Sequence, residues 1–229
     1  MIGMEKNSQP DSQNQEQFND NLILSSFDGL RIRYSHWVEN LKSVAEVTIG
    51  TLGPKGTTSE MTSFSLIVAL RQSGVNNVNT KLYENFAMVT KALFNREVDV
   101  ILIPNAYDRI SDIYWDPRIK IDVYFQHVTP KYGLYARHSD ITTKRDTILS
   151  VMPACTSIID HLQQTNSDSK SQFVQITSST EEAARLVAEG KADIAITNEL
   201  CAKKYGLVSL ASEYHVEMLW TVFSLKRGN

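Results

Sequence analysis

The stretch from Ile49 to Glu60 constrains the fold of this chain more than any other. An apolar run ends at Ile49, a glycine-rich segment follows, and a helical pattern opens at Thr57. Thr57 and Glu60 have the Thr-x-x-Glu spacing of a capping box, which predicts a helix N-terminus. Gly53 and Gly56 allow the backbone to turn sharply. The stretch therefore predicts a strand, a tight loop and a helix.

This helix N-terminus is predicted to bind an anion. Its first amides have no partner within the helix, and Thr57, Thr58 and Ser59 place three hydroxyl groups beside them. The helix dipole favours a negative charge there by about 0.3–1 kcal/mol. The loop has neither the Walker A spacing nor the dinucleotide fingerprint, so carboxylate and phosphate both remain open. A purely structural strand-to-helix turn would use the same residues.

Composition excludes several classes of protein. With 229 residues, 42% hydrophobic and 21% charged, the chain is long enough for one large domain or two small lobes. A net charge of −3 without a basic run gives no electrostatic footprint for nucleic acid. No apolar stretch has the length of a membrane span, and no signal peptide is recognisable. The isolated Cys155 and Cys201 predict neither a metal site nor a disulfide framework. These features favour the cytoplasm.

The pattern along the chain predicts two α/β lobes. Residues 1–17 are polar and are expected to be disordered, and residues 18–44 are expected to form one or two helices. Strands and helices then alternate, which predicts a parallel sheet whose carboxyl-end edge holds the glycine loop and the segment from Pro104 to Tyr107. The expected strands are 78–84, 98–103, 119–125, 132–137, 147–152, 172–177, 192–197 and 216–225; the expected helices are 86–94, 155–164, 179–189 and 198–204. Residues 108–118 are expected to form a loop.

A second helix N-terminus of the same kind is predicted at Ser179. Ser179 and Glu182 repeat the capping-box spacing, and Thr180 adds another hydroxyl group. We expect residues 1–44 to precede a first lobe of residues 45–127 plus 212–229, with a second lobe of residues 128–211. Two anion-binding helix ends that face one cleft between these lobes would suit a ligand with two carboxylates. Simple helix caps are the alternative for Ser179 and Thr180.

Four segments together resemble the prephenate dehydratase superfamily. They are Leu52 to Glu60, which is similar to the Leu-Gly-Pro-x-Gly-Thr-x-Ser signature, then Ser179 to Val187, Ala192 to Ile196, and Tyr205-Gly206-Leu207. The resemblance covers roughly residues 47–225. It implies a two-lobed fold like that of periplasmic binding proteins, with the substrate cleft between the lobes. It also implies prephenate as a small-molecule substrate, no cofactor, no metal, and no nucleic-acid or membrane partner. Related domains are often dimers, so a homodimer is left open.

The departures from the family pattern point to one branch of it. Thr221 and Phe223 match the Thr-Arg-Phe motif, whose threonine is regarded as catalytic, but Val222 replaces the arginine. Leu219 stands where the family has asparagine, and a Pro-Asn-Ala-Tyr segment replaces Pro-x-Glu-Asn-Ser. No regulatory domain is expected after the last strand. This pattern resembles the non-aromatising prephenate decarboxylases of secondary metabolism, which serve bacilysin-type and aeruginosin-type antibiotic or peptide biosynthesis.

The resemblance implies loss of CO2 from prephenate with retention of the ring hydroxyl. The hypothesis assigns substrate binding to Thr57, Thr58, Ser59, Asn105, Ser179 and Thr180. It assigns catalysis to Thr221, Tyr107 and His127, where a packed aromatic and a structural histidine are the alternatives for the last two. A prephenate dehydratase that makes phenylpyruvate and a two-lobed small-molecule binding module are the competing functions.

Overall fold

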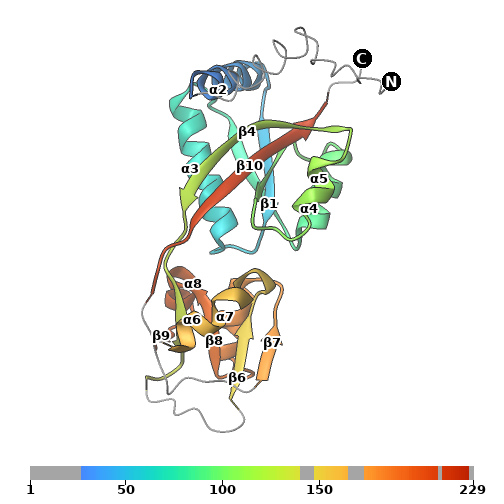
Figure 1. Cartoon of the computed structure of the whole chain (residues 1–229). Helices are drawn as coiled ribbons and strands as arrows, with labels where there is room; N and C mark the ends of the chain where they lie inside the picture. The colour runs from blue at the N-terminus through green and yellow to red at the C-terminus, as the bar shows by residue number, and fades with distance from the viewer. Residues whose placement is uncertain (1–26, 140–146, 165–172, 211–212, 227–229) are drawn as a thin grey trace, which may run out of the picture.

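The protein folds into two α/β lobes, each built on a five-stranded sheet (Figure 1). The computed structural model describes residues 27–139, 147–164, 173–210 and 213–226. The predicted fold class, a two-lobed α/β protein, is confirmed. The predicted disorder of residues 1–17 concerns residues outside the described part.

The upper lobe carries both ends of the described chain (Figure 1). Its sheet has the strand order β2-β1-β3-β10-β4, with β1, β2 and β3 parallel and β10 antiparallel to both of its neighbours. The elements are α2 (Phe27–Lys42), β1 (Val47–Leu52), α3 (Thr58–Gln72), β2 (Val78–Tyr83), α4 (Phe86–Phe94), β3 (Val100–Pro104), α5 (Ile110–Tyr114), β4 (Ile119–Val128) and β10 (Glu217–Leu225).

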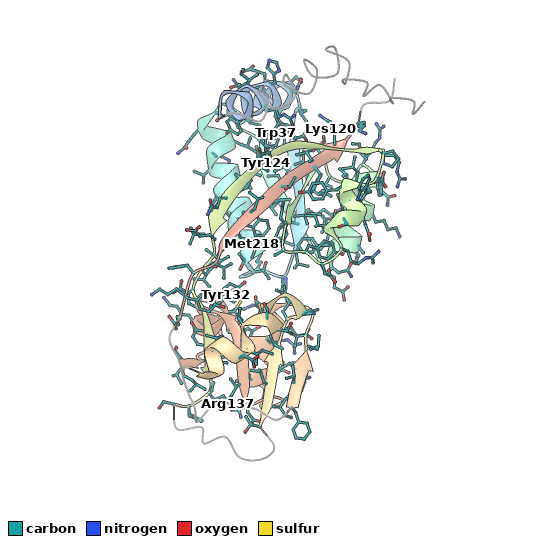
Figure 2. All side chains as sticks on the ribbon, viewed as in Figure 1. Trp37, Lys120, Tyr124, Tyr132, Arg137 and Met218 are labelled. Carbon is teal, nitrogen blue, oxygen red and sulfur yellow. The ribbon has the colours of Figure 1, made fainter. Side chains whose placement is uncertain are left out.

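Both faces of the upper sheet are covered by helices. Alternate residues of β3 face opposite sides: Val100 and Leu102 pack under α2 and α3, whereas Ile101 and Ile103 pack under α4 and α5. All five residues of β3 are buried. A strand covered on both faces reads as a continuous apolar run, which is why this strand was predictable from sequence. Figure 2 shows Trp37 of α2 directed toward the sheet.

The lower lobe has the strand order β7-β6-β8-β5-β9. Strand β6 is parallel to β7 and β8, and β5 is antiparallel to β8 and β9. The elements are β5 (Tyr132–Ala136), β6 (Ile148–Val151), the 3₁₀ helix η1 (Pro153–Ile158), α6 (Ile159–Gln164), β7 (Phe173–Ile176), α7 (Thr180–Ala188), β8 (Ile194–Asn198), α8 (Glu199–Lys204) and β9 (Val208–Ser209).

The chain passes between the lobes twice, between β4 and β5 and again between β9 and β10 (Figure 1). The two passages are hydrogen-bonded to each other. The Thr129 amide donates to the Val216 carbonyl oxygen at 2.9 Å, and Tyr132 and Tyr214 exchange two backbone bonds of 2.8 and 3.0 Å. Figure 2 places Tyr132 where the lower lobe begins. The lobes are therefore joined by a two-stranded connection.

Two predicted segments differ from the structure. Residues 108–118, expected to be a loop, contain the single helical turn of α5, whose Ile113 is buried. Five residues are too few for a periodic pattern to be visible. The helix expected over residues 155–164 begins as a 3₁₀ helix at Pro153, because proline is favoured at the first helical position.

Candidate functional site

Two glycines shape the loop that leads into α3. At Gly53, an added Cβ atom would lie 3.1 Å from Leu82 Cβ and 3.3 Å from the Tyr83 carbonyl oxygen. The Gly53 amide donates to that same oxygen at 2.7 Å. Gly56 has a φ of +93°, a conformation that residues with a side chain rarely adopt. The loop therefore runs close to β2 and then turns sharply into the helix.

The α3 capping box forms as predicted. Thr57 Oγ1 accepts from the Glu60 amide at 3.3 Å and donates to the last carbonyl oxygen of β1 at 3.2 Å. Glu60 Oε2 accepts from the Gly56 amide at 2.6 Å. The Thr57 hydroxyl is thus fully engaged in the cap. The amides of Thr58 and Ser59 and the Ser59 hydroxyl make no hydrogen bond within the described part of the chain, so these donors remain for a ligand.

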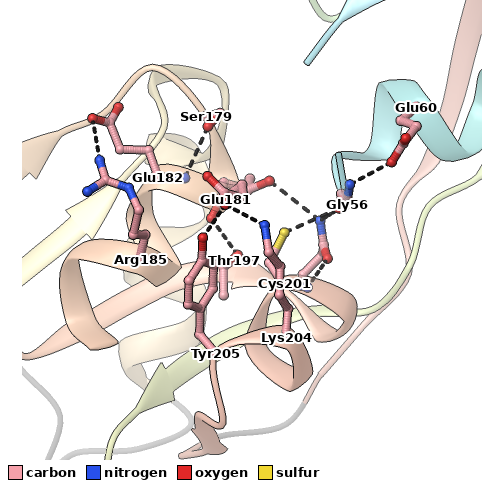
Figure 3. Close-up of polar contacts among 12 residues, drawn as sticks. Gly56, Glu60, Ser179, Glu181, Glu182, Arg185, Thr197, Cys201, Lys204 and Tyr205 are labelled. Carbon is pink, nitrogen blue, oxygen red and sulfur yellow. Dashed lines mark hydrogen bonds and ion pairs between the residues drawn. The ribbon is translucent and has the colours of Figure 1, made fainter. Parts of the chain in front are cut away.

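The second predicted capping box is also present, at α7 (Figure 3). Ser179 Oγ accepts from the Glu182 amide at 3.1 Å. Glu182 Oε2 accepts from the backbone amide and the hydroxyl of Ser178, each at 2.7 Å, and these bonds hold the pKa of Glu182 below its ordinary value. Among the described residues, no partner accepts from the backbone amides of Thr180 and Glu181. The lower lobe therefore offers a second set of unpaired helix amides.

The Glu181 carboxylate ties α7 to α8 (Figure 3). The hydroxyl of Tyr205 and the ammonium of Lys204, the latter at 2.7 Å, both donate to Glu181 Oε1. The hydrogen bond from Lys204 to Glu181 raises the pKa of the lysine. Tyr205 of the Tyr-Gly-Leu motif thus holds the lower helix end in place, and the lysine balances the nearby carboxylate.

Asn198 connects the two helix ends. Its side chain is fully buried, and its Nδ2 donates to the Gly56 carbonyl oxygen at 3.5 Å and to Thr180 Oγ1 at 3.4 Å. Its Oδ1 accepts from the Leu200 and Cys201 amides and so caps α8. All four hydrogen-bonding positions of the amide are therefore used. Sequence analysis placed a helix start at this residue but gave it no role in the site.

Further contacts join the lobes at the same place. Cys201 Sγ donates to the Gly56 carbonyl oxygen at 3.2 Å, as the dashed line in Figure 3 shows. Thr58 Oγ1 lies 2.7 Å from the hydroxyl of Tyr132. The structure therefore brings the predicted residues Thr57, Thr58 and Thr180 to one interlobe junction, through contacts that sequence analysis did not foresee.

A closed ring of hydrogen bonds lies at the carboxyl end of β3. Asn105 Nδ2 donates to the Tyr114 hydroxyl at 3.0 Å, and Thr221 Oγ1 donates to Asn105 Oδ1 at 2.8 Å. Tyr114 OH and Thr221 Oγ1 are 3.2 Å apart. Since the Thr221 hydrogen is already given to Asn105, Tyr114 is the donor in this third bond. The sequence predicted Asn105 and Thr221 but missed Tyr114, which belongs to the unpredicted helix α5.

His127 does not join this ring. It pairs with Met218 in the β4–β10 ladder, three residues from Thr221, and an odd separation puts the His127 and Thr221 side chains on opposite faces of the sheet. His127 Nδ1 lies 3.1 Å from Thr62 Oγ1, and its Nε2 lies 3.0 Å from Ser65 Oγ. Burial lowers the pKa of His127. Its contacts with α3 fit a structural histidine.

Tyr107 and Val222 occupy apolar surroundings. The Tyr107 ring packs against Phe86 with centroids 4.7 Å apart, and burial raises the pKa of its hydroxyl. Val222 is fully buried under α2 and α3, on the face of the sheet opposite to Thr221. The residue that replaces the family arginine therefore points away from the Thr221 hydroxyl.

The structure also shows hollows away from the junction. One, of about 840 Å³, lies under α2 and is lined by residues that include Trp37, Asp99 and Lys120. His127 lines another, of about 380 Å³, beside α3 and β4. Neither includes a residue of the two helix ends. Within the described residues, no cluster of potential metal ligands is found, and no helix has the length and apolar character needed to cross a membrane.

Comparisons with solved structures agree with this architecture. A prephenate dehydratase from Arthrobacter aurescens, in complex with L-Phe, superposes with a TM-score of 0.54 at 18% identity, covering 80% of this chain and 61% of that one. This chain thus spans about three fifths of the dehydratase. A periplasmic substrate-binding protein of an ABC transporter from Coxiella burnetii gives 0.53 at 18% identity, covering 78% and 84% of the two chains. The protein thus has the two-lobed fold shared by these molecules.

Curated sequences give the family. A prephenate decarboxylase from Planktothrix agardhii is 34% identical over 183 residues, which cover 80% of this chain and 90% of the relative. A prephenate decarboxylase from Bacillus subtilis is 32% identical over 187 residues, with coverages of 77% and 86%. No family model matches the chain. The chain belongs to the prephenate decarboxylase family, within the prephenate dehydratase-like superfamily.

Proposed function

We propose that this protein is a prephenate decarboxylase, a carboxy-lyase that releases the ring carboxyl of prephenate as CO2 and keeps the ring hydroxyl. The product is a dihydro-4-hydroxyphenylpyruvate. The observation that carries the proposal is the match to four curated relatives of this name at 31–34% identity.

The geometry of the junction supports a substrate with two carboxylates. The N-termini of α3 and α7 each have two amides without a partner among the described residues, and Asn198 contacts both helix ends. Helix N-termini attract anions through these amides and through the dipole. Each carboxylate of prephenate would take one helix end, assisted by the hydroxyls of Ser59 and Thr180.

The proposed site keeps most of the predicted residues. Thr57 and Ser179 act through the caps they form, and Thr58 acts through its amide. Thr221 and Asn105 lie at the carboxyl end of β3, with Tyr107 in the loop that follows Asn105. His127 is not included among the proposed catalytic residues, because its side chain faces α3 on the other side of the sheet. We propose no metal and no cofactor for this chemistry.

A prephenate dehydratase is the second candidate, because the hydroxyl of Thr221 is present beside the carboxyl end of β3. Such an enzyme would also expel the ring hydroxyl and release phenylpyruvate. A two-lobed binding module without turnover is the third outcome of the same test.

Purified protein incubated with prephenate tests all three functions. Products are resolved by mass spectrometry without acid work-up, since acid itself aromatises prephenate. A product that has lost CO2 and kept the ring hydroxyl supports the decarboxylase. Phenylpyruvate would establish the dehydratase, and unchanged prephenate would leave a binding role.

We extend the proposal to the setting of the enzyme. A product with a non-aromatic ring suits secondary metabolism, such as antibiotic or non-ribosomal peptide biosynthesis. Two unpaired cysteines fit a reducing cytoplasm. Exposed apolar side chains on α2, α3 and β4, among them Ile32, Phe64 and Tyr124, would suit a homodimer, which light scattering would test. We also propose lobe boundaries at residues 45–127 plus 212–229 and 128–211.

A further inference from the structure

We propose that the ring formed by Asn105, Tyr114 and Thr221 determines which product leaves the site, with Tyr114 as its positioning residue. The inference rests on the proposed decarboxylation of prephenate. It concerns the fate of the ring hydroxyl and not the loss of CO2.

The donors of the ring are almost fully used inside it. Thr221 has one hydroxyl hydrogen, which it gives to Asn105 Oδ1 at 2.8 Å. Tyr114 has one hydroxyl hydrogen, which it gives to Thr221 Oγ1 at 3.2 Å. Asn105 gives one of its two amide hydrogens to Tyr114 at 3.0 Å. Neither hydroxyl therefore has a hydrogen left to offer a ligand.

The surroundings fix the ring in this arrangement. Thr221 is only 1% exposed. The backbone amide of Asn105 donates to the Leu219 carbonyl oxygen at 2.8 Å, which ties the end of β3 to β10. The Tyr114 ring packs edge-on against Phe223 with centroids 5.3 Å apart. Thr221 on β10 and Tyr114 on α5 are thus held by packing, and Asn105, in the turn after β3, is held by its backbone bond to β10.

The chemistry of prephenate shows why this ring of hydrogen bonds could decide which product forms. Loss of CO2 breaks the bond from the ring carbon to the carboxyl carbon, and the electron pair moves into the ring double bonds. If the incoming proton joins the departing hydroxyl, water leaves and the ring becomes aromatic. If a proton from solvent water joins a ring carbon, the hydroxyl stays. Each route consumes one proton, and they differ only in the atom that receives it.

A hydroxyl group that could donate to the ring hydroxyl of the substrate would favour loss of water. The hydrogen-bond ring of Asn105, Tyr114 and Thr221 prevents this, because Tyr114 and Asn105 together fix the direction of the Thr221 hydroxyl hydrogen. Without the Tyr114 hydroxyl, the Asn105 amide is free to turn and donate to Thr221. The Thr221 hydrogen would then point outward, toward the substrate.

The test is the product ratio of Tyr114→Phe, which keeps the aromatic contact and removes the two hydrogen bonds that the Tyr114 hydroxyl makes, with Asn105 and with Thr221. We expect the ratio of phenylpyruvate to hydroxyl-retaining product to rise by roughly two- to tenfold, which is the effect of one hydrogen bond from Thr221 to the hydroxyl of the substrate. Asn105→Ala removes the acceptor of the Thr221 hydrogen and should shift the ratio the same way. Adding Thr221→Val to Tyr114→Phe should return the ratio to that of the wild type.

Tyr34→Phe is the matched control, since it removes a tyrosine hydrogen bond of 3.0 Å, to Ser73, on α2 of the same lobe. Its product ratio should equal that of the wild type. The inference is overturned if Tyr114→Phe consumes prephenate and yields the wild-type ratio. It is also overturned if Tyr114→Phe loses all consumption of prephenate, because a residue that only sets the product is not needed for loss of CO2. A wild-type protein that leaves prephenate unchanged would instead overturn the proposed function itself.

Discussion

Thr58 Oγ1 and the hydroxyl of Tyr132 lie 2.7 Å apart, although 74 residues separate them in the chain. Thr58 is the first residue of α3 in the upper lobe, and Tyr132 opens β5 in the lower lobe. Both residues are buried, and burial raises the pKa of Tyr132 well above its ordinary value, so its hydroxyl stays protonated. The position of the upper helix end is thus coupled directly to the lower lobe.

A double-mutant cycle on Thr58→Val and Tyr132→Phe should measure this coupling. Each single variant should lower the free energy of unfolding by about 1 kcal/mol, because it leaves a buried hydroxyl without its partner. The double variant should cost less than the sum, with a coupling of about 0.5–1.5 kcal/mol from urea unfolding curves. Costs that add within about 0.3 kcal/mol would show that the contact does not stabilise the protein.

The hydroxyls of Thr57 and Ser59 should have separable effects. Thr57→Ala removes the cap of α3 and should lower the free energy of unfolding by about 1 kcal/mol. Thr57→Ser keeps the capping oxygen and is the control, with a loss of only a few tenths of a kcal/mol. Equal losses for both variants would mean that the methyl group and not the cap matters here.

Ser59→Ala should affect substrate binding instead. No described residue accepts or donates a hydrogen bond to the Ser59 hydroxyl, so its removal should change the free energy of unfolding by less than about 0.5 kcal/mol. A hydrogen bond to a carboxylate is worth about 1.5–3 kcal/mol, so the KM for prephenate should rise roughly tenfold or more. An unchanged KM would remove Ser59 from the site.

Glu182→Gln should make stability less dependent on pH. The pKa of Glu182 is lowered in the folded protein by its bonds from Ser178, so the carboxylate stabilises the fold above the ordinary value of 4.5. That contribution is lost as the pH falls through the lowered folded pKa. The variant should therefore be less stable than the wild type at pH 7, and the two stabilities should converge only once the pH has fallen below the lowered folded pKa of Glu182. A gap that persists at low pH would contradict this origin.

Short sequence motifs predicted the N-termini of α3 and α7 correctly. Capping boxes are short motifs whose residues lie three positions apart, so Thr57 with Glu60 and Ser179 with Glu182 were readable from the chain. The buried strand β3 was readable because both of its faces are covered. These features depend only on neighbouring residues.

Contacts between distant segments were not readable in the same way. Tyr114 joins Thr221 across 107 residues, and Asn198 joins Gly56 across 142. No periodicity in the sequence encodes such distances. His127 illustrates the same limit: its strand was predicted, but the face it occupies depends on the pairing register with β10, which the sequence alone left undetermined.

Gly56→Ala should weaken substrate binding as well as stability. Gly56 has a φ of +93°, and Gly190, the matched control, has a φ of +75°. An alanine at either position should cost about 1 kcal/mol of unfolding free energy. Of these two glycines, and within the described residues, Gly56 is the one whose carbonyl oxygen accepts from the lower-lobe donors Cys201 and Asn198. A displacement of Gly56 should therefore disturb the junction, whereas a displacement of Gly190 should not.

The KM for prephenate should therefore rise for Gly56→Ala and stay at the wild-type value for Gly190→Ala, at temperatures where both variants are folded. Gly190 follows α7 near Arg137, which Figure 2 places in the part of the lower lobe away from the junction. An equal rise in KM for both glycines would mean that general destabilisation weakens binding. An unchanged KM for Gly56→Ala would mean that the contacts of its carbonyl oxygen do not help to form the site.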